Sequence, residues 1–231
     1  MVSIWMRLDK YVSKSTVLTA AQVLEVIARG EISVNDSVTD DPSYQVHKNN
    51  TVHWLDTRLE CRPFRYIMLN KPPNMICSNI DEHYPSVFNL VDIPHQHELH
   101  IAGRLDADTT GLVLITDDGS WSYRLTHPDN HCPKVYRVCL AKPISDDMIM
   151  RLEKGVLLQG ESAPTLPAAI DVVAANEVLL TITQGKFHQV KRMFAAVGNR
   201  VKALHREAIG EINLDVEVGQ WRYISVNDNQ H

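Results

Sequence analysis

Two aspartates in a short glycine-bounded segment are the residues of this 231-residue chain best suited to do chemistry. Asp106 and Asp108 stand two residues apart, shortly before the apolar run from Gly111 to Thr116, and Arg104 precedes them. A carboxylate at the edge of a buried strand can be held rigidly, as a nucleophile must be. Residue types alone nevertheless favour an acidic turn that caps a strand, so the segment becomes a candidate site only if other polar groups join it.

A second segment, from Lys134 to Leu140, could bring a tyrosine to the same place. Its side chains alternate in polarity, which predicts a half-buried strand that carries Tyr136. A tyrosine on a strand more often packs in a core or an interface than takes part in catalysis. Tyr136 is therefore a candidate only in combination with the other segments.

A third segment contributes a lysine. Residues 188–197 predict a helix whose apolar face is formed by three residues: Val190, Phe194 and Val197. At about 100° per residue, Lys191 borders this face and Arg192 points outward. A lysine at the edge of a core usually extends its ammonium to water. It can instead pair with a buried carboxylate, for which Asp106 is the candidate.

The elements that would position these side chains are mostly strands. Apolar runs and alternating patterns predict strands at residues 66–70, 111–116, 134–140, 178–183, 200–204 and 221–226. The sequence Lys71-Pro72-Pro73 ends the first strand, because proline cannot donate to the sheet. Asp117-Asp118-Gly119 predicts a turn after the second.

A smaller α+β unit precedes these strands. Thr19 and Gln22 have the spacing of a capping box, which predicts the start of a helix that ends near Gly30. Short strands are expected at residues 32–38 and 53–56, where they would form a small sheet. We therefore predict three segments, a domain at residues 1–58, a polar linker at residues 59–63 and a second domain at residues 64–231.

The composition is that of a folded globular protein without a basic bias. Hydrophobic residues make up 44% of the chain and charged residues 22%, which argues against long disorder. The formal net charge is −5. Any nucleic-acid site must therefore be a local basic patch on an acidic protein.

Cysteines, histidines and the amino terminus argue against several other classes of protein. The four cysteines show no C-x-x-C spacing, so reduced thiols are expected. His95 to His100 lacks the spacing of helical metal ligands and predicts a solvated loop. Met1 to Met6 lacks the basic start of a signal peptide, and no apolar run reaches the roughly 18 residues of a membrane helix. We expect a cytoplasmic protein that contacts no membrane.

Taken together, the three candidate segments resemble the motifs of the RsuA/RluA superfamily of pseudouridine synthases. Gly103-Arg104-Leu105-Asp106 followed by Thr110-Gly111-Leu112 is similar to the signature of that superfamily. Lys134-x-Tyr136 is similar to its second motif, and the segment from His188 to Met193 to its third. The order and the spacing of the segments match as well.

The amino-terminal unit resembles a known RNA-binding domain. Arg7-Leu8-Asp9-Lys10 and the segment from Arg29 to Asn35 are similar to the domain first seen in ribosomal protein S4. The resemblance to an RNA-modifying enzyme with this additional domain covers about residues 7–225. It implies an α+β fold, with a small RNA-binding α+β domain followed by a catalytic domain built on a mixed, mainly antiparallel sheet flanked by helices.

The resemblance also implies a reaction and the residues that perform it. These enzymes detach a flipped uracil from its ribose and rejoin it through carbon five. Asp106 would be the essential carboxylate, which either forms a covalent adduct or stabilises an oxocarbenium-like sugar. Tyr136 would stack on the uracil and could act as a base, and Lys191 would keep Asp106 ionised and oriented. Asp108 is expected to be structural.

RNA contacts are implied in both domains. They are expected at eight residues: Arg7, Lys10, Lys14, Arg29, Arg104, His188, Gln189 and Arg192. Residues 7–58 carry six basic and seven acidic residues, so RNA binding by this unit is expected to be either weak or confined to its four candidate cations, Arg7, Lys10, Lys14 and Arg29. A lysine at position 191 lacks the bidentate clamp that an arginine would give. No cofactor and no metal is expected, because the isomerisation needs neither a redox step nor an electrophilic metal.

The implied partner is ribosomal RNA, either 16S RNA of the small subunit or a small-subunit assembly intermediate, and the protein is expected to be a monomer. Large-subunit RNA is the alternative target. A ribosome-assembly factor with little catalysis is a second alternative, against which the intact Asp106, Tyr136 and Lys191 speak. A glycosidase that uses Asp106 and Asp108 is a third, and the RNA-binding unit disfavours it.

Overall fold

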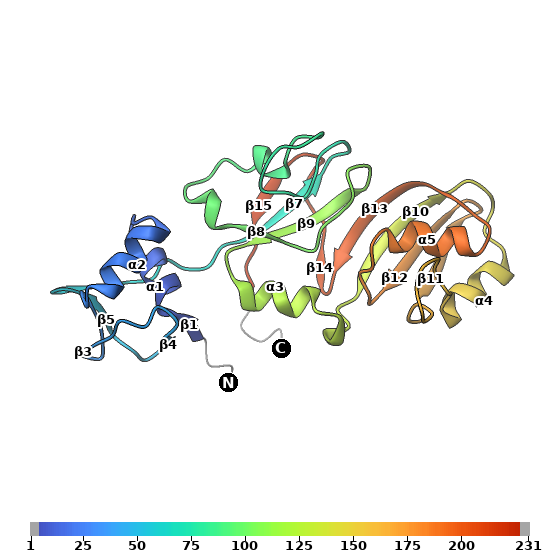
Figure 1. Cartoon of the computed structure of the whole chain (residues 1–231). Coiled ribbons are helices and arrows are strands. Elements are labelled where there is room, and N and C mark those ends of the chain that lie inside the picture. The colour runs from blue at the N-terminus through green and yellow to red at the C-terminus, as the bar shows by residue number, and fades with distance from the viewer. Residues whose placement is uncertain (1–4, 227–231) are drawn as a thin grey trace. The chain divides into compact units, whose positions relative to one another are not determined.

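The computed structural model of the protein describes residues 5–226 and divides the chain into two compact units, Met1–Pro63 and Phe64–His231 (Figure 1). Most of the Met1–Met6 segment, in which no signal peptide was expected, lies outside the described residues. The segment expected to be a linker, residues 59–63, falls within the first unit. Leu59 is buried in the core of that unit, so at least this part of the segment belongs to the fold rather than to connecting chain.

The first unit packs two helices on short strands. Its elements are β1 (Trp5–Arg7), α1 (Leu8–Ser15), α2 (Ala20–Ala28), β2 (Ile32–Val34), β3 (Ser37–Val38), β4 (Gln45–His47), β5 (Val52–Trp54) and β6 (Thr57–Arg58). The strands form a sheet of order β3-β2-β5-β6 and a separate β1-β4 pair. Thr19 and Gln22 exchange side-chain and backbone hydrogen bonds at the start of α2, so the predicted capping box is confirmed. Leu8 and Ile27 are fully buried and join the two helices in one core.

The second unit is built on a sheet that has nine strands within residues 5–226. The strand order is β11-β12-β10-β13-β9-β7-β15, and β8 and β14 pair with β9 and β13 at the side. The strands are β7 (Tyr66–Lys71), β8 (His100–Ala102), β9 (Thr110–Thr116), β10 (Lys134–Leu140), β11 (Ala169–Ala174), β12 (Glu177–Ile182), β13 (Val201–Ile209), β14 (Ile212–Asn213) and β15 (Trp221–Tyr223). Among the strands described here, β9 and β13 form the one parallel pair. The predicted α+β fold with a mixed, mainly antiparallel sheet is confirmed.

The parallel pair joins the two antiparallel halves of the sheet. It consists of His205 beside Thr110 and Arg206 beside Gly111. Gly111 has a φ of +102°, and a Cβ at this position would lie 2.3 Å from the carbonyl oxygen of Arg206. Glycine alone allows both the backbone angle and the close approach. The glycine of the sequence motif is therefore required by the junction between the halves, immediately after the loop that carries Asp106.

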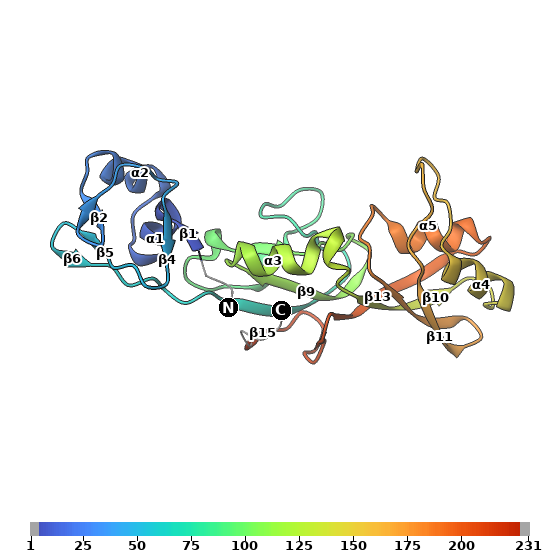
Figure 2. The same cartoon turned by 90° about the horizontal axis from the view of Figure 1, so that it is seen from below.

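Helices α3 (Gly119–Thr126) and α5 (Gln189–Ala196) cover the same face of the sheet, as two views show (Figure 1, Figure 2). Helix α5 lies within the segment for which a helix was predicted. Helix α3 begins where the sequence indicated only a turn. The reason is Asp118, whose carboxylate accepts hydrogen bonds from the backbone N–H groups of Ser120 and Trp121 and so caps a helix.

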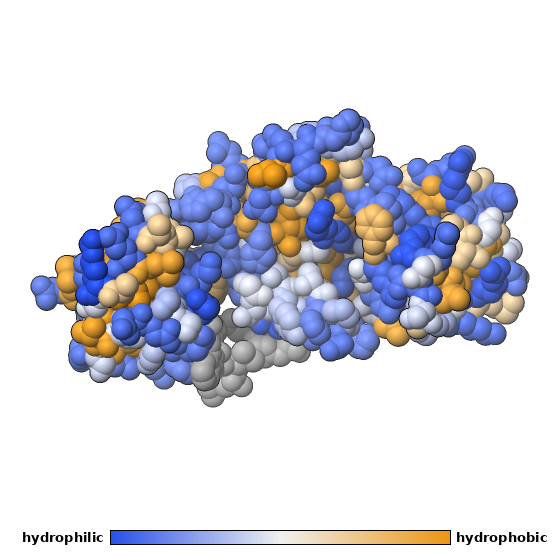
Figure 3. All heavy atoms as spheres, viewed as in Figure 1, coloured by the Kyte–Doolittle hydropathy of each residue, from blue (hydrophilic) through white to orange (hydrophobic). Residues whose placement is uncertain are grey.

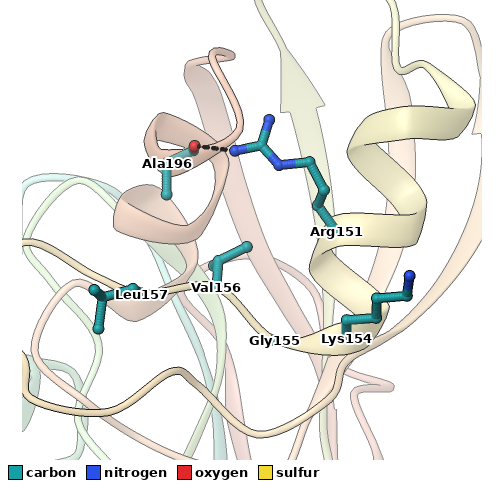
Figure 4. A pocket seen from close by; sticks show the side chains of 6 residues that line it. All are labelled: Arg151, Lys154, Gly155, Val156, Leu157 and Ala196. Atoms are coloured by element: carbon teal, nitrogen blue, oxygen red, sulfur yellow. Dashed lines mark hydrogen bonds between the residues drawn. The ribbon is translucent and has the colours of Figure 1, made fainter.

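Helix α4 (Asp146–Lys154) braces the far end of α5. The side chain of Ser145 caps its amino terminus. From its last turn, Arg151 donates a hydrogen bond of 2.8 Å to the backbone carbonyl of Ala196 (Figure 4). These two residues line a hollow of about 360 Å³ together with residues 154–157. A cation at the last carbonyls of a helix is favourable, so the contact holds the carboxyl end of α5 against α4.

The connections and the surface complete the second unit. Short 3₁₀ helices lie in the connections, η1 (Val87–Leu90), η2 (Gln96–Glu98) and η3 (Pro128–Asn130). In the space-filling view, hydrophilic residues cover most of this unit and hydrophobic residues show as separate patches among them (Figure 3). Among the residues that the structure describes, no helix has the length and apolar character needed to cross a membrane.

Candidate active site

Asp106 lies in the loop between β8 and β9, in contact with two side chains at the start of α5. The Nζ atom of Lys191 is 2.9 Å from Oδ2 of Asp106 and 2.6 Å from Oδ1 of Asp108. The Nε2 atom of His188 is 3.3 Å from Oδ1 of Asp106. The pairing of Lys191 with Asp106 that the sequence suggested is therefore present, and Lys191 holds the second aspartate as well.

The ion pairs shift pKa values in opposite directions. Burial lowers the pKa of Lys191, but the hydrogen bonds and charges of the two aspartates outweigh it and raise the pKa above the ordinary 10.5. Burial raises the pKa of Asp108, but the hydrogen bond and charge of Lys191 outweigh it and lower the pKa below the ordinary 3.8. The side chain of Asp106 is 30% exposed and that of Asp108 is 71% exposed. Asp106 is thus the inner carboxylate of the pair.

A buried arginine on β13 holds both ends of the Asp106 loop. Arg206 is 2% exposed, and its guanidinium donates to the carbonyl of Gly103 at 2.7 Å and to that of Leu112 at 2.8 Å. A longer bond of 3.5 Å reaches the carbonyl of Arg104. A buried charge of this kind is tolerated when its N–H groups find acceptors. Backbone groups on both sides of Asp106 therefore converge on one side chain.

A buried lysine at the end of β7 holds the middle of the same loop. Lys71 is fully buried, and its Nζ atom donates to the carbonyls of Ala107 and Thr109 at 3.1 and 2.8 Å. Burial lowers the pKa of this lysine, and the nearby aspartates act in the opposite direction. Lys71 and Arg206 together fix the backbone before and after Asp106, so the carboxylate is held by the fold and not only by its ion pair.

Neither buried cation was predicted to belong to the site. The predicted strand ended at Leu204, whereas β13 continues to Ile209, with Leu204, Arg206 and Ala208 buried in alternation. Extending the period of two along the chain would have placed Arg206 in the core. For Lys71 no local signal exists, because two of its acceptors lie 36 and 38 residues further along the chain.

Replacement of Arg206 by methionine tests this arrangement of the loop. We expect the free energy of unfolding to fall by about 3 kcal/mol or more, because each buried carbonyl left without a donor costs about 1–3 kcal/mol. Urea denaturation followed by circular dichroism measures the change. The matched control is Arg200→Met at an exposed position just before β13, which should shift the free energy by less than about 0.5 kcal/mol. Equal losses in both variants would contradict the role of Arg206.

The cluster lies on the wall of a cleft of about 740 Å³ in the second unit. Among the described residues that line it, five side chains are basic and one is acidic: Arg104, Lys134, Lys186, Lys191, Arg206 and Asp106. Tyr136 also lines the cleft and is 8% exposed, and its hydroxyl accepts a long hydrogen bond of 3.4 Å from Arg206. On a chain with a net charge of −5, this cleft is a local basic surface suited to a polyanion. Within residues 5–226, no group of three or more metal-ligating side chains could hold a metal ion.

The RNA contacts expected in the Asp106 loop and at the start of α5 divide between the cleft and the interior. Arg104 is exposed at the cleft, and the side chain of His188 is 40% exposed there. Gln189 is only 4% exposed, and its Oε1 atom accepts a hydrogen bond of 2.9 Å from the backbone N–H of Lys186. Gln189 is therefore an internal brace of the turn before α5, and at 4% exposure it offers RNA very little surface.

Arg192 was expected to point outward and to contact RNA, but the structure corrects its direction. Its guanidinium donates to the carbonyls of Gln159 and Phe187 at 2.6 and 3.0 Å and pairs with Glu161 at 3.3 Å. Backbone acceptors and a carboxylate thus satisfy the cation within the protein, and its side chain is 26% exposed. Arg192 connects α5 to the loop that precedes β11.

In the first unit, three of the four cations expected to bind RNA are on the surface. Arg7, Lys10 and Arg29 are exposed, although Arg7 pairs with a neighbouring aspartate at 2.8 Å and Arg29 with a glutamate one turn away. Lys14 is only 6% exposed. Because so little of this residue is exposed, Lys14 is not part of the interface proposed below.

Both units match known protein families. Residues 65–196 match the sequence model of the RNA pseudouridylate synthase family, and residues 6–52 match that of the S4 domain. A crystal structure described as that of a pseudouridylate synthase is similar with a TM-score of 0.69 and 42% sequence identity, over 95% of this chain and 96% of that one. The chain belongs to the RNA pseudouridylate synthase family, and the resemblance drawn from its motifs is confirmed.

Curated relatives narrow the comparison within the family. A protein of Vibrio parahaemolyticus is 48% identical over 95% of this chain and 96% of its own length. A protein of Haemophilus influenzae is 42% identical over 96% of this chain and 97% of its own length. Both are named ribosomal small subunit pseudouridine synthase A. The present chain is thus an RNA pseudouridine synthase, similar over nearly its whole length to enzymes with that name.

Proposed function

We propose that this enzyme converts one uridine of small-subunit ribosomal RNA to pseudouridine, with Asp106 as the essential carboxylate. The observation that carries the proposal is the environment of Asp106. It is the one acidic side chain among the described residues that line a basic cleft, and Lys191 pairs with it at 2.9 Å. The two relatives named for the small ribosomal subunit support this choice of RNA.

The chemistry begins with a nucleotide outside the base stack. Flipping a uridine costs a few kcal/mol of stacking, which contacts in the basic cleft offset. The bond between ribose C1′ and uracil N1 then breaks, and the developing sugar cation needs a carboxylate beside it. Asp106 either bonds covalently to the nucleotide or stabilises this cation. The detached uracil rotates, C5 bonds to C1′, and the proton of C5 is lost while N1 gains one.

Other residues of the cleft prepare this step. Lys191 pairs with Asp106 and fixes the direction of its oxygens. Tyr136 packs against the uracil, and its hydroxyl takes part in moving the proton of C5. Arg104, exposed at the cleft, contacts the RNA backbone around the flipped nucleotide. Neither a metal nor an organic cofactor enters any of these steps.

The first unit supplies additional RNA contacts in the proposal. Its surface cations Arg7, Lys10 and Arg29 contact parts of the RNA other than the target uridine. These contacts add affinity but do not select the base. The substrate is 16S RNA, either free or in a small-subunit assembly intermediate, and the enzyme acts on it as a monomer. Small subunits of bacteria are assembled in the cytoplasm, so the enzyme acts there.

Chemical mapping of pseudouridine in ribosomal RNA tests the proposed function. In cells that lack this protein, one small-subunit site should lose its pseudouridine, and all large-subunit sites should remain. Expression of the wild type should restore the site, whereas expression of the Asp106→Asn variant at the same level should not. If a large-subunit site lost its pseudouridine instead, the substrate would be large-subunit RNA. An unchanged map in both subunits would overturn the proposal.

A further inference from the structure

An exposed aromatic ring lies at the cleft without a role in the proposed reaction. Phe187 is 76% exposed, the second most exposed large hydrophobic side chain among the residues described. One face of its ring stacks on His188, with ring centroids 3.7 Å apart and an angle of 20° between the planes. Because so much of the ring is exposed, its other face is open to solvent. Both residues line the cleft that contains Asp106.

The backbone around this ring is held firmly. The carbonyl of Phe187 accepts a hydrogen bond of 3.0 Å from Arg192, and the N–H of Lys186 donates to Gln189 at 2.9 Å. His188 has a left-handed backbone conformation with a φ of 49°, which non-glycine residues seldom adopt and which costs of order 1 kcal/mol. The internal contacts of Gln189 and Arg192 thus keep an unusual turn that presents the Phe187 ring.

The ring is connected to the carboxylate through one side chain. His188 stacks on Phe187 and also approaches Asp106, with Nε2 3.3 Å from Oδ1. A flat group that stacked on the open face of Phe187 would therefore form the outer layer of a series, with Phe187, His188 and then the carboxylate of Asp106 beneath it. Basic side chains of the same cleft, Arg104 and Lys186 among them, would meet the phosphates attached to such a group.

We propose that Phe187 is a stacking platform for an unpaired nucleobase next to the flipped uridine. The inference rests on the proposed function and adds a second base-binding position to it. Single-stranded RNA bases are held mainly by stacking on aromatic side chains, and phenylalanine does so without preference for a particular base. A base held there fixes the position of the RNA strand relative to Asp106, so that the neighbouring uridine enters the cleft.

The test uses the full-length protein and an RNA fragment that contains the uridine identified by mapping. Stacking of one base contributes about 1–3 kcal/mol, which corresponds to roughly 5- to 150-fold in affinity. Phe187→Ala should weaken binding of the fragment, measured by fluorescence anisotropy, within this range, and Phe187→Trp should restore it. Tyr223→Ala is the matched control, an exposed aromatic residue on the edge strand β15 whose loss should leave binding unchanged.

A second fragment separates stacking from a general loss of contact. It carries an abasic nucleotide at the position next to the target uridine. The wild type should bind it as weakly as Phe187→Ala binds the intact fragment, and the variant should lose nothing further. Equal affinities of the wild type and Phe187→Ala for the intact fragment, with pseudouridine formed by both, would overturn the inference while leaving the proposed function standing. A pseudouridine map that stays unchanged in cells lacking the protein overturns both.

Discussion

Replacement of Asp106 by asparagine should lower the single-turnover rate of pseudouridine formation by at least about 1000-fold, the loss typical of a removed nucleophile or essential charge. Asparagine has the shape of aspartate, so Lys71 and Arg206 still hold the loop through backbone carbonyls. What is lost is the negative charge that the proposed mechanism requires. Release of tritium from C5-labelled uridine in RNA measures the rate, and the affinity for that RNA should change by less than about tenfold, because the carboxylate itself repels phosphate.

Asp108→Asn is the control that separates the two aspartates. Asp108 also pairs with Lys191, at 2.6 Å, but its side chain is 71% exposed and does not line the cleft. An exposed ion pair contributes only about 0–1 kcal/mol, so the rate should fall by less than about tenfold. Similar losses in both variants would show that the pair acts as one unit and would contradict the assignment of the reaction to Asp106 alone.

The parts of the site that the sequence predicted are those that follow a local period. Lys191 was placed at the edge of an apolar helix face by the 3.6-residue repeat, and it pairs with Asp106 from that position. Tyr136 lies on a strand of period two and is buried at the cleft. Asp106 became prominent only through the motifs around it, because its own residue type was compatible with an ordinary acidic turn.

The parts that could not be predicted depend on partners far away in the chain. The period of two could have placed Arg206 in the core, but it could not identify the carbonyls 94 and 103 residues earlier that accept its hydrogen bonds. Gln189 and Arg192 were expected to contact RNA, but a backbone N–H donor holds the first and carbonyl and carboxylate acceptors hold the second. Helix α4 was missed although Ser145 precedes two acidic residues, a start signal that could have been used.

The charge cluster defines a pH range for the enzyme. The pKa of Lys191 lies above 10.5, so the stability gained from its positive charge is fully present below that pH and is lost as the pH rises through the raised pKa. The pKa of Asp108 lies below 3.8, so its contribution is present above that pH and is lost as the pH falls through the lowered value. The Lys191 to Asp108 pair is therefore intact throughout the neutral range. A rate change between pH 6 and pH 9 must therefore come from a group outside this pair.

Replacement of Lys191 by methionine should lower the rate by about 100-fold or more while changing RNA affinity by only a few fold. Methionine keeps the length of the side chain but leaves Asp106 without the cation that directs its oxygens, and a misdirected catalytic group costs about this much. Lys191→Arg should recover part of the rate, because it restores the charge with a different geometry. The control is Lys154→Met, which removes an exposed lysine at the end of α4 and should change neither quantity.

Two measurements on the Lys191→Met variant decide its role. If the ammonium acts through Asp106, the double variant with Asp106→Asn should be no slower than Asp106→Asn alone, because the cation then has no inner carboxylate to direct. If it acts instead by attracting RNA, affinity and rate should fall in parallel and the two substitutions should add. The second outcome would remove Lys191 from the catalytic group and make it one more basic residue of the cleft. Two observations favour an action through Asp106. The ammonium of Lys191 lies 2.9 Å from the carboxylate of Asp106, and the two aspartates raise the pKa of Lys191 although burial alone would lower it.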